Sequence, residues 1–264
     1  MNTAARFDGF SLALHVLGGL ILLFILAPLV GMALATPGTA LMAAAVDAEV
    51  RTSIWLTLWT SMAGTLLLAV AAVPFAWFLA RRGFPGKRLV AAIIDLPVVI
   101  PHSAAGIALL GMLNRDSLLG GMAESCGFTF VGHAAGIMVA MAFVSLPFLV
   151  NAARDAFAAV PERLEKAALS LGASPLRVFV TISLPLAWRG ILTGVVMMFA
   201  RGLSEFGAVL IIAYHPMVAP VSIYERFTSY GLSAARGPTL LFILVCLAVF
   251  VCLRLIAGRR HVAL

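Results

Sequence analysis

Residues 133–152 read HAAGIMVAMAFVSLPFLVNA, a stretch that contains no aspartate, glutamate, lysine or arginine. An α-helix of about 20 residues is long enough to cross the hydrocarbon core of a bilayer, which is about 30 Å thick. Lipid offers the backbone no hydrogen-bond partners, so such a segment must satisfy its own N–H and C=O groups as a helix. The stretch therefore predicts one transmembrane α-helix.

Comparable apolar blocks recur along the whole 264-residue chain. Hydrophobic residues make up 62% of the sequence and charged residues only 11%, whereas soluble domains carry roughly 25% charged residues. The composition excludes a soluble globular domain and predicts one all-α domain, residues 1–264, of a polytopic membrane protein. The six predicted transmembrane helices are residues 11–36, 54–80, 89–113, 133–152, 187–213 and 238–257.

The basic residues are divided unevenly between the two sets of predicted loops. If the first residues are cytoplasmic, 13 of the 18 Lys and Arg residues fall in cytoplasmic segments, four fall in outer segments, and Arg201 lies within a span. This division follows the positive-inside rule and predicts that both termini are cytoplasmic. The net charge of +7 therefore orients the chain in the membrane, and no nucleic acid partner is expected. The predicted cytoplasmic basic residues are Arg6, Arg81, Arg82, Lys87, Arg88, Arg154, Arg163, Lys166, Arg177, Arg189, Arg254, Arg259 and Arg260.

The longest polar connection, residues 160–185, has a local pattern of its own. Pro161 suits the first turn of a helix, and Gly172 stands where a left-handed residue would end that helix. Ser174 and Pro175 then read as an N-cap and a first-turn proline of a second short helix. The segment predicts a helix–turn–helix elbow at the cytoplasmic surface, which either docks into a groove of a partner protein or merely links two spans. The residues that share one face of its first helix are Leu164, Ala167, Ala168 and Leu171.

The common catalytic and nucleotide-binding motifs are missing from the sequence. There is no G-x-x-x-x-G-K-[ST] phosphate loop, no H-E-x-x-H zinc pair and no G-x-S-x-G nucleophile elbow, and the three cysteines show no paired spacing. We therefore expect no catalytic residue, no metal site and no cofactor in this chain. Two alternative classes are an intramembrane enzyme, which would need such a motif, and a gradient-driven carrier, which would need no energy-supplying subunit.

The elbow resembles the EAA loop of ABC-importer permeases, whose pattern is E-A-A, three residues, Gly, nine residues and I-x-L-P. The matching residues are Ala167, Ala168, Gly172, Ile182, Leu184 and Pro185. Lys166 stands where the family carries its glutamate, and Glu165 lies one residue earlier. The resemblance implies that the elbow is a coupling helix seated in a cleft of a separate ATPase subunit, which binds ATP and Mg. The residues assigned to this coupling contact are Glu165, Lys166, Ala167, Ala168, Gly172 and Pro185.

The C-terminal third is similar to the molybdate/tungstate permeases, in particular to their archaeal-type group. Residues 200–235 read ARGLSEFGAVLIIAYHPMVAPVSIYERFTSYGLSAA, and residues 96–113 read LPVVIPHSAAGIALLGML, which also resembles the related sulfate permeases. The resemblance implies a homodimeric pore in the inner membrane, two ATPase subunits beneath it and an extracytoplasmic oxyanion-binding protein above it. A sulfate or thiosulfate permease is the alternative.

Two polar sites inside the predicted spans are candidates for the path of the oxyanion. Charges inside spans are costly and usually face protein or water. Arg201 and Glu205, near the middle of the fifth predicted span, lie on one helix face. They either face a pore or dimer interface or form a neutralised structural pair, and we favour the structural pair because a free glutamate would repel an oxyanion. Ser204 lies between them in the sequence and is a further candidate for the path.

The second polar site lies in the third predicted span. Pro97 and Pro101 interrupt its helical hydrogen bonds, and an interrupted backbone at membrane depth is tolerated where it lines a cavity. His102 and Ser103 follow and offer donors to an anion, while a kink that only shapes the packing is the alternative.

Two outer segments complete the predicted arrangement. Residues 114–132 are rich in glycine and are expected to be irregular. Residues 214–236 are either a docking surface for the binding protein or a simple outer loop. The residues of this candidate surface are Tyr214, His215, Arg226, Tyr230 and Arg236.

Overall fold

The computed structural model describes residues 9–258, with side chains as far as residue 255. Arg6, Arg259 and Arg260, which were assigned to the cytoplasmic side, lie outside this part of the chain. Every regular element between residues 9 and 258 is helical. Five helices in this range are long and apolar enough to cross a membrane, and a bent pair of shorter helices, α4 (Lys87–Val99) and α5 (His102–Leu113), brings the number to six if the pair is counted as one span. The prediction of an all-α polytopic membrane protein is confirmed.

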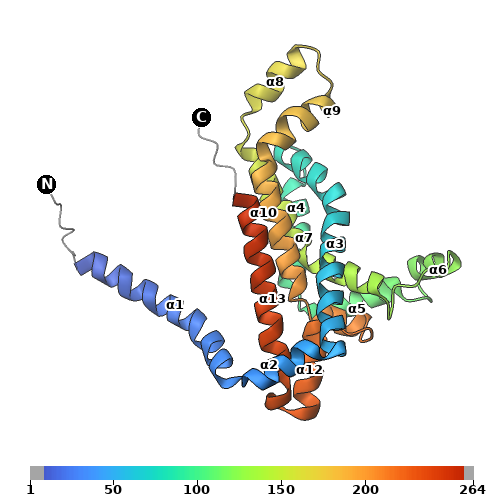
Figure 1. Ribbon diagram of the computed structural model, residues 1–264. Coiled ribbons are helices and arrows are strands. Elements are labelled where there is room, and N and C mark those ends of the chain that lie inside the picture. Colours follow the sequence, from blue (N-terminus) through green and yellow to red (C-terminus); the bar gives the residue numbers. More distant parts are fainter. Residues whose placement is uncertain (1–8, 259–264) are drawn as a thin grey trace.

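The long helices α3, α7, α10 and α13 stand side by side, and an elbow projects beyond one end of them (Figure 1). The ends of α1 and α13 that lie nearest the termini both point toward the elbow end of the molecule (Figure 1). The helices are α1 (Gly9–Ala35), α2 (Gly38–Val46), α3 (Ala48–Arg81), α4 (Lys87–Val99), α5 (His102–Leu113), α6 (Leu118–Ser125), α7 (Ala134–Ala159), α8 (Glu162–Ser170), α9 (Pro175–Val178), the π-helix η1 (Phe179–Ser183), α10 (Leu184–Leu203), α11 (Gly207–Ile212), α12 (Ala219–Tyr230) and α13 (Leu232–Gly258).

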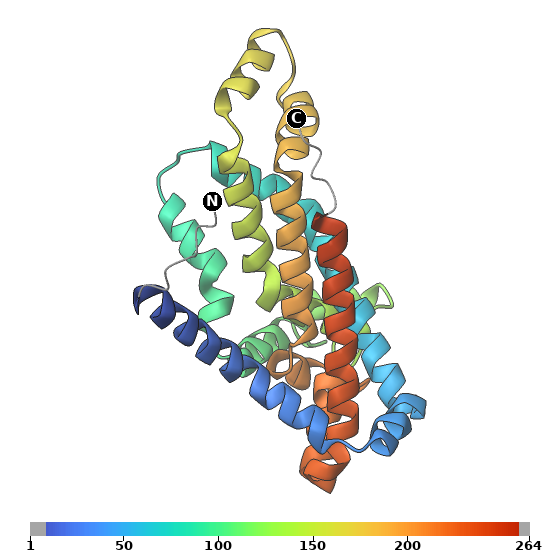
Figure 2. The same cartoon turned by 60° about the vertical axis from the view of Figure 1, so that its left-hand side comes forward.

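Helix α1 leans away from the other helices and contains no buried residue (Figure 2). The helices α3, α7 and α10 instead pack closely, through small side chains. A Cβ atom added to Gly190 or Gly194 of α10 would press on Ala156 or Ala152 of α7. Small residues at such contacts let membrane helices approach each other closely and gain van der Waals contact.

The third predicted span, residues 89–113, is two helices that meet at an angle of 109°. The break lies at Ile100 and Pro101, where Ile100 is extended with ψ 145°. A proline disfavours the helical conformation of the residue before it, which explains the position of the break. The prediction for Pro97 was partly wrong, because α4 continues past this buried proline to Val99.

The fifth predicted span, residues 187–213, has different ends in the structure. One continuous helical segment runs from Pro175 to Leu203, and the short helix α11 follows after a break. The second helix of the elbow therefore does not stop at Pro185 but continues into the membrane. Pro185 has no N–H to bond the preceding turn, and the helix widens there to a π-turn in which Leu184 N–H bonds Phe179 C=O.

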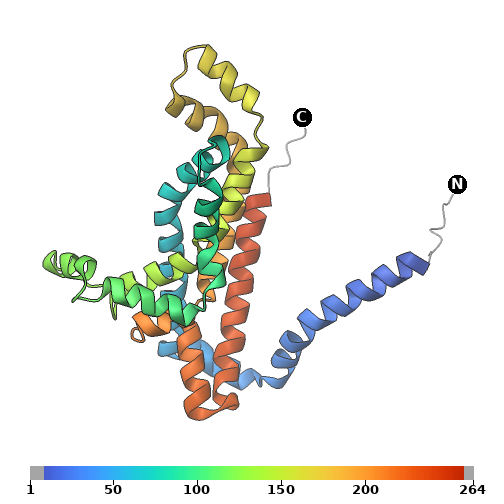
Figure 3. The same cartoon turned by 180° about the vertical axis from the view of Figure 1, so that it is seen from behind.

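Two short helices, α6 and α12, branch from the bundle of long helices. Residues 114–132 contain α6, which projects sideways (Figure 3), so the expectation of an irregular loop was partly wrong. Ser117 begins this helix, since its Oγ accepts a hydrogen bond from Gly120 N–H at 3.0 Å. The other branch, α12, lies between α11 and α13.

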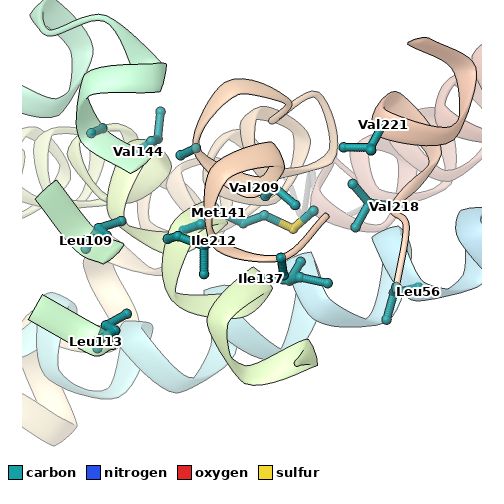
Figure 4. Packing of buried hydrophobic residues seen from close by; sticks show 14 residues of the cluster. Leu56, Leu109, Leu113, Ile137, Met141, Val144, Val209, Ile212, Val218 and Val221 are labelled. Atoms are coloured by element: carbon teal, nitrogen blue, oxygen red, sulfur yellow. The ribbon is translucent and has the colours of Figure 1, made fainter. Parts of the chain in front are cut away.

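The short helices α5 and α11 pack on α7 through a buried apolar cluster. This cluster includes Leu109 of α5, Ile137 of α7 and Ile212 of α11 (Figure 4). A Cβ atom on Gly106 of α5 would lie 2.9 Å from Ala208 Cα of α11, and one on Gly207 would lie 3.0 Å from His102 Cβ. The breaks in the third and fifth spans are therefore adjacent in space.

Candidate functional site

The elbow is fixed to the bundle by a buried carboxylate, Glu165, which is 6% exposed. Arg81, at the end of α3, donates from Nε to Glu165 Oε2 at 2.8 Å and from Nη2 to Oε1 at 2.9 Å. Ser183 of η1 donates from Oγ to Oε1 at 2.7 Å. Arg81 also donates to Val160 C=O at 2.9 Å. We refer to Arg81, Glu165 and Ser183 as the elbow anchor, because they join α8 to α3 and η1.

The elbow anchor keeps Glu165 ionised. Burial alone would raise the pKa of Glu165, but the hydrogen bonds from Arg81 and Ser183 and the charge of Arg81 outweigh it and hold the pKa below its usual value. The sequence prediction assigned Glu165 to a contact with an ATPase subunit, whereas its carboxylate faces its own chain. Arg81 was counted only as a loop charge, and nothing in the local pattern marked it as the partner of a residue 84 positions away.

The other residues assigned to the coupling contact lie mainly on the surface. Lys166 and Ala167 are exposed, and Ala168 is half-buried. Gly172 is exposed with φ +86°, which confirms the predicted left-handed end of the helix. Pro185 is exposed but lies at the start of α10, away from α8.

The tip of the elbow is apolar although it projects beyond the spans (Figure 1). Leu171 is 89% exposed and Leu176 is 72% exposed. Lys166 forms a surface ion pair with Glu162, with Nζ 2.8 Å from Oε2. Exposed apolar side chains with a charged rim are typical of a surface that another protein covers.

Helix α10 carries a polar stripe that winds around it, because each step of four residues turns the stripe by about 40°. Arg189, Thr193, Met197 and Arg201 are spaced four residues apart, and each is at least partly exposed. Met197 borders an open cavity of about 450 Å³ whose other walls belong to α4 and α7. A charged arginine within a spanning helix is costly against lipid, so the part of the stripe around Arg201 belongs against water or protein. The i, i+4 spacing was available in the sequence, but only Arg201 was selected from it.

A hydrogen bond between two residues that line the cavity joins α4 to α7. Asn151 of α7 donates from Nδ2 to Asp95 Oδ1 of α4 at 2.6 Å, and both residues line the cavity. The sequence gave no partner for Asp95, which lies within the third predicted span, residues 89–113. The remaining lining residues are Val98, Val99, Pro147, Phe148, Ala152 and Met197.

At the end of the stripe farthest from the elbow, the breaks after α4 and α10 bring His102, Arg201 and Glu205 together. Glu205 is fully buried, and its Oε2 lies 3.0 Å from His102 Nδ1 and 3.2 Å from Arg201 Nη1. Arg201 Nη2 lies 2.8 Å from His102 Nε2. We refer to these three residues as the Arg201 cluster.

The charges of Arg201 and Glu205 are paired inside the cluster. Arg201 Nη2 lies within hydrogen-bond distance of both ring nitrogens of His102, 3.0 Å from Nδ1 and 2.8 Å from Nε2. Glu205 Oε2 is buried and accepts no hydrogen bond from the part of the chain that the structure describes, but it lies within ion-pair distance of Arg201. The positive charge of Arg201 is therefore balanced by the carboxylate of Glu205.

The members of the Arg201 cluster differ in their access to the surface. The side chains of Arg201 and His102 are 22% and 35% exposed, and that of Glu205 is 0% exposed. The neighbouring Ser103 and Ser204 are exposed, and Ser204 Oγ lies 3.3 Å from Arg201 Nη1. The pair is thus formed within the chain, while the assignment of Arg201 to a pore or a dimer interface stays a prediction.

The position of the Arg201 cluster corrects the predicted one. Arg201 lies in the last turn of α10, not in the middle of a span, and Glu205 lies beyond the end of this helix. At 1.5 Å per residue, Arg201 is about 26 Å along the axis from Leu184. Pro101 lies at the break beside the cluster, and Pro97 lies one turn earlier in α4.

The candidate outer surface at residues 214–236 is largely helical, and two of its residues have partners within the chain. Arg226 Nη2 donates to Asp47 Oδ2 at 2.8 Å and to Glu49 Oε2 at 3.2 Å. Burial opposes ionisation of Asp47, but the bond from Arg226 and two backbone N–H groups lower its pKa. Arg236 donates to Ala35 C=O at 3.3 Å. The exposed residues that remain are Tyr214, His215 and Tyr230.

The sequence of the chain is similar to those of known membrane transport proteins. Residues 72–261 match the family described as binding-protein-dependent transport system inner membrane component. The chain is 43% identical over 215 residues to the molybdate/tungstate transport system permease protein of Thermococcus kodakarensis, and the match covers 81% of this chain and 82% of the relative. It is 38% identical over 183 residues to the probable sulfate transport system permease protein of Chlorokybus atmophyticus, with 68% and 64% covered.

The fold is also similar to a solved structure, that of a bacterial ABC transporter involved in the import of the acidic polysaccharide alginate. The TM-score is 0.73 at 17% sequence identity, and the match covers 96% of each chain. At this identity the likeness shows a shared fold and carries no information about the substrate.

Proposed function

Since the chain belongs to the family of binding-protein-dependent transport system inner membrane components, we propose that two copies of it form the pore of an ATP-driven importer of molybdate and tungstate. The observation that carries this proposal is the continuity of one helix, Pro175–Leu203. The elbow lies at one end of this helix, and Arg201 lies in its last turn at the other. A force applied to the elbow by a partner is therefore transmitted directly to the Arg201 cluster.

The identity of the oxyanion is inferred from the relatives. The molybdate/tungstate permease shares more identical residues over more of its length than the sulfate permease does. Molybdate, tungstate and sulfate are all tetrahedral anions with two negative charges. Import of sulfate or thiosulfate is therefore the second candidate, which the experiment must distinguish from import of molybdate and tungstate.

Coupling to ATP is assigned to the exposed part of the elbow. Leu171 and Leu176 at its tip offer apolar surface, and Ala167 allows close approach of a partner's backbone. Glu165 has a different role from the one first assigned to it: it fixes the elbow to its own chain. Two ATPase subunits, each covering one elbow, would bind ATP and Mg and hydrolyse the nucleotide outside this chain.

The translocation path follows the polar stripe of α10. His102, Ser103, Arg201 and Ser204 lie at its outer end, and the cavity between α4, α7 and α10 follows toward the elbow. An arginine whose charge is already balanced by Glu205 binds an oxyanion only modestly, which suits a site that must release what it receives. Selection of the oxyanion then belongs to an extracytoplasmic binding protein that docks on the outer end.

The distribution of basic residues supports an orientation with the elbow and both termini in the cytoplasm. On this arrangement the protein lies in the cytoplasmic membrane, and α12 and the exposed tyrosines Tyr214 and Tyr230 face outward. Closure of the ATPase subunits on ATP would draw the two elbows together and open the pore outward, and hydrolysis would reverse this movement.

The proposal is tested by uptake of labelled molybdate, tungstate and sulfate in a strain that lacks the native genes for these importers. We expect the full chain with its ATPase and binding protein to restore molybdate and tungstate uptake, and Ala167→Trp to abolish both uptake and co-purification of the ATPase. Ala43→Trp, at an exposed alanine of α2, is the matched control and should retain both. Normal assembly of the Ala167→Trp variant would show that the elbow is not the coupling contact, and uptake of sulfate alone would favour the second candidate.

A further inference from the structure

Glu205 places a buried carboxylate oxygen beside Arg201, and this oxygen accepts no hydrogen bond from the described residues. Its Oε2 lies 3.2 Å from Arg201 Nη1 and 3.0 Å from His102 Nδ1. Its side chain is fully buried, while that of Arg201 is 22% exposed. The guanidinium therefore reaches the surface with its charge already balanced from inside the protein.

The negative charge of Glu205 is not needed for its other contact. Glu205 Oε1 accepts a hydrogen bond from Ala208 N–H at 3.0 Å, at the start of α11. The amide oxygen of a glutamine accepts the same bond. A buried carboxylate is costly to keep ionised, so a residue that served only to begin α11 would not need to carry a charge.

We propose that Glu205 sets the affinity of the path for its oxyanion, acting as a resident counter-anion that weakens binding to Arg201 and allows release. This inference rests on the proposed function, because it takes the Arg201 cluster to lie on the path. A guanidinium with an uncompensated charge would hold a tetrahedral dianion through two charge-assisted hydrogen bonds. With Glu205 beside Arg201, the oxyanion is attracted by the guanidinium and repelled by the buried carboxylate. Both energies grow in proportion to the charge of the oxyanion.

The test measures anion binding to the full chain in lipid nanodiscs by equilibrium dialysis. For tungstate, we expect the dissociation constant of Glu205→Gln to be at least about tenfold lower than that of the wild type. For perrhenate, a tetrahedral anion with a single charge, the decrease should be about threefold, because the Coulomb energy scales with the charge of the anion. A change of packing alone would not follow the charge of the anion in this way.

Two further variants keep the result interpretable. Glu124→Gln removes one negative charge from the exposed helix α6 and should leave both dissociation constants unchanged. Ser204→Lys adds a positive charge at an exposed neighbour of Arg201 and leaves Glu205 in place, so it should also tighten tungstate binding more than perrhenate binding. Ser204→Lys is the positive control for a change of charge beside Arg201, and if Glu205→Gln does not fold, Glu205→Met, which also removes the carboxylate, takes its place.

The inference is overturned if Glu205→Gln does not tighten tungstate binding, or if tungstate and perrhenate respond to it equally. Arg201→Gln separates this failure from that of the proposed path. If Arg201→Gln loses tungstate binding while Glu205→Gln does not tighten it, only the role of Glu205 is refuted. If Arg201→Gln binds tungstate as the wild type does, the Arg201 cluster is not on the path at all.

Discussion

Replacing Glu165 with glutamine removes the negative charge at the centre of the elbow anchor and leaves a side chain of nearly the same shape. Arg81 is only 8% exposed, so its guanidinium would remain buried without a counter-ion. Breaking a buried ion pair from one side costs about 3–5 kcal/mol. We expect the free energy of unfolding to fall by about 3 kcal/mol, at the lower end of this range, because the amide oxygen of glutamine still accepts hydrogen bonds from Arg81 or Ser183.

This loss is large enough to measure by thermal unfolding. For a chain of this size about 1 kcal/mol corresponds to a shift of about 2–4 °C in Tm, so Glu165→Gln should lower Tm by about 6–12 °C. Tryptophan fluorescence is a suitable readout, since Trp77 packs edge-on against Phe179 with ring centroids 5.4 Å apart, next to the anchor. The matched control is Glu162→Gln, which breaks the exposed pair with Lys166 on the same helix and should leave Tm unchanged.

A double-mutant cycle separates the ion pair from unrelated effects of each substitution. Arg81→Gln and Glu165→Gln should each destabilise the chain strongly, and the double variant should lose much less than their sum, because it leaves no unpaired charge. In reconstituted complexes, Glu165→Gln should also transport fewer oxyanions for each ATP hydrolysed, since the elbow would be less firmly tied to α3. If the two single effects add within about 0.5 kcal/mol, the anchor is not an energetic unit and the reasoning fails.

Two other predictions follow from the described contacts. The stabilising effect of Glu165 should be lost at low pH, because its pKa in the folded state is lowered. The difference in Tm between wild type and Glu165→Gln should have its full size above the unfolded-state pKa of about 4.3. It should shrink as the pH falls through the folded-state pKa. A difference that instead disappears toward high pH would contradict the assignment. Gly106→Val should separate α5 from α11, since its Cβ would lie 2.9 Å from Ala208 Cα and 3.0 Å from Ala208 O. We expect the free energy of unfolding to fall by about 1–3 kcal/mol and oxyanion uptake to weaken. The control Gly111→Val, whose added Cβ has no neighbouring side chain or helix of the described residues within 4 Å, should behave as the wild type.

The sequence by itself determined the class of the protein and the positions of most spans. A transmembrane helix satisfies its backbone hydrogen bonds within its own segment, so a run of apolar residues is sufficient to predict it. The left-handed Gly172 and the interruption at Pro101 were predictable for a similar reason, since both depend on the conformation that one residue allows its immediate neighbours. The resemblance of the elbow to a known pattern likewise needed only nineteen consecutive residues, 167–185.

The tertiary structure decided which polar groups meet and which face outward. Glu165 and Arg81 lie 84 residues apart, and Arg201 and His102 lie 99 residues apart, so neither pair leaves a periodic signal in the sequence. The end of α10 was likewise not predictable from the local sequence, because the spacing of Arg201 and Glu205 suggested a continuing helix. There the carboxylate instead binds Ala208 N–H and begins α11. Local patterns predict helices because helices are held by local bonds, whereas the charge, burial and exposure of a site depend on contacts that only folding brings together.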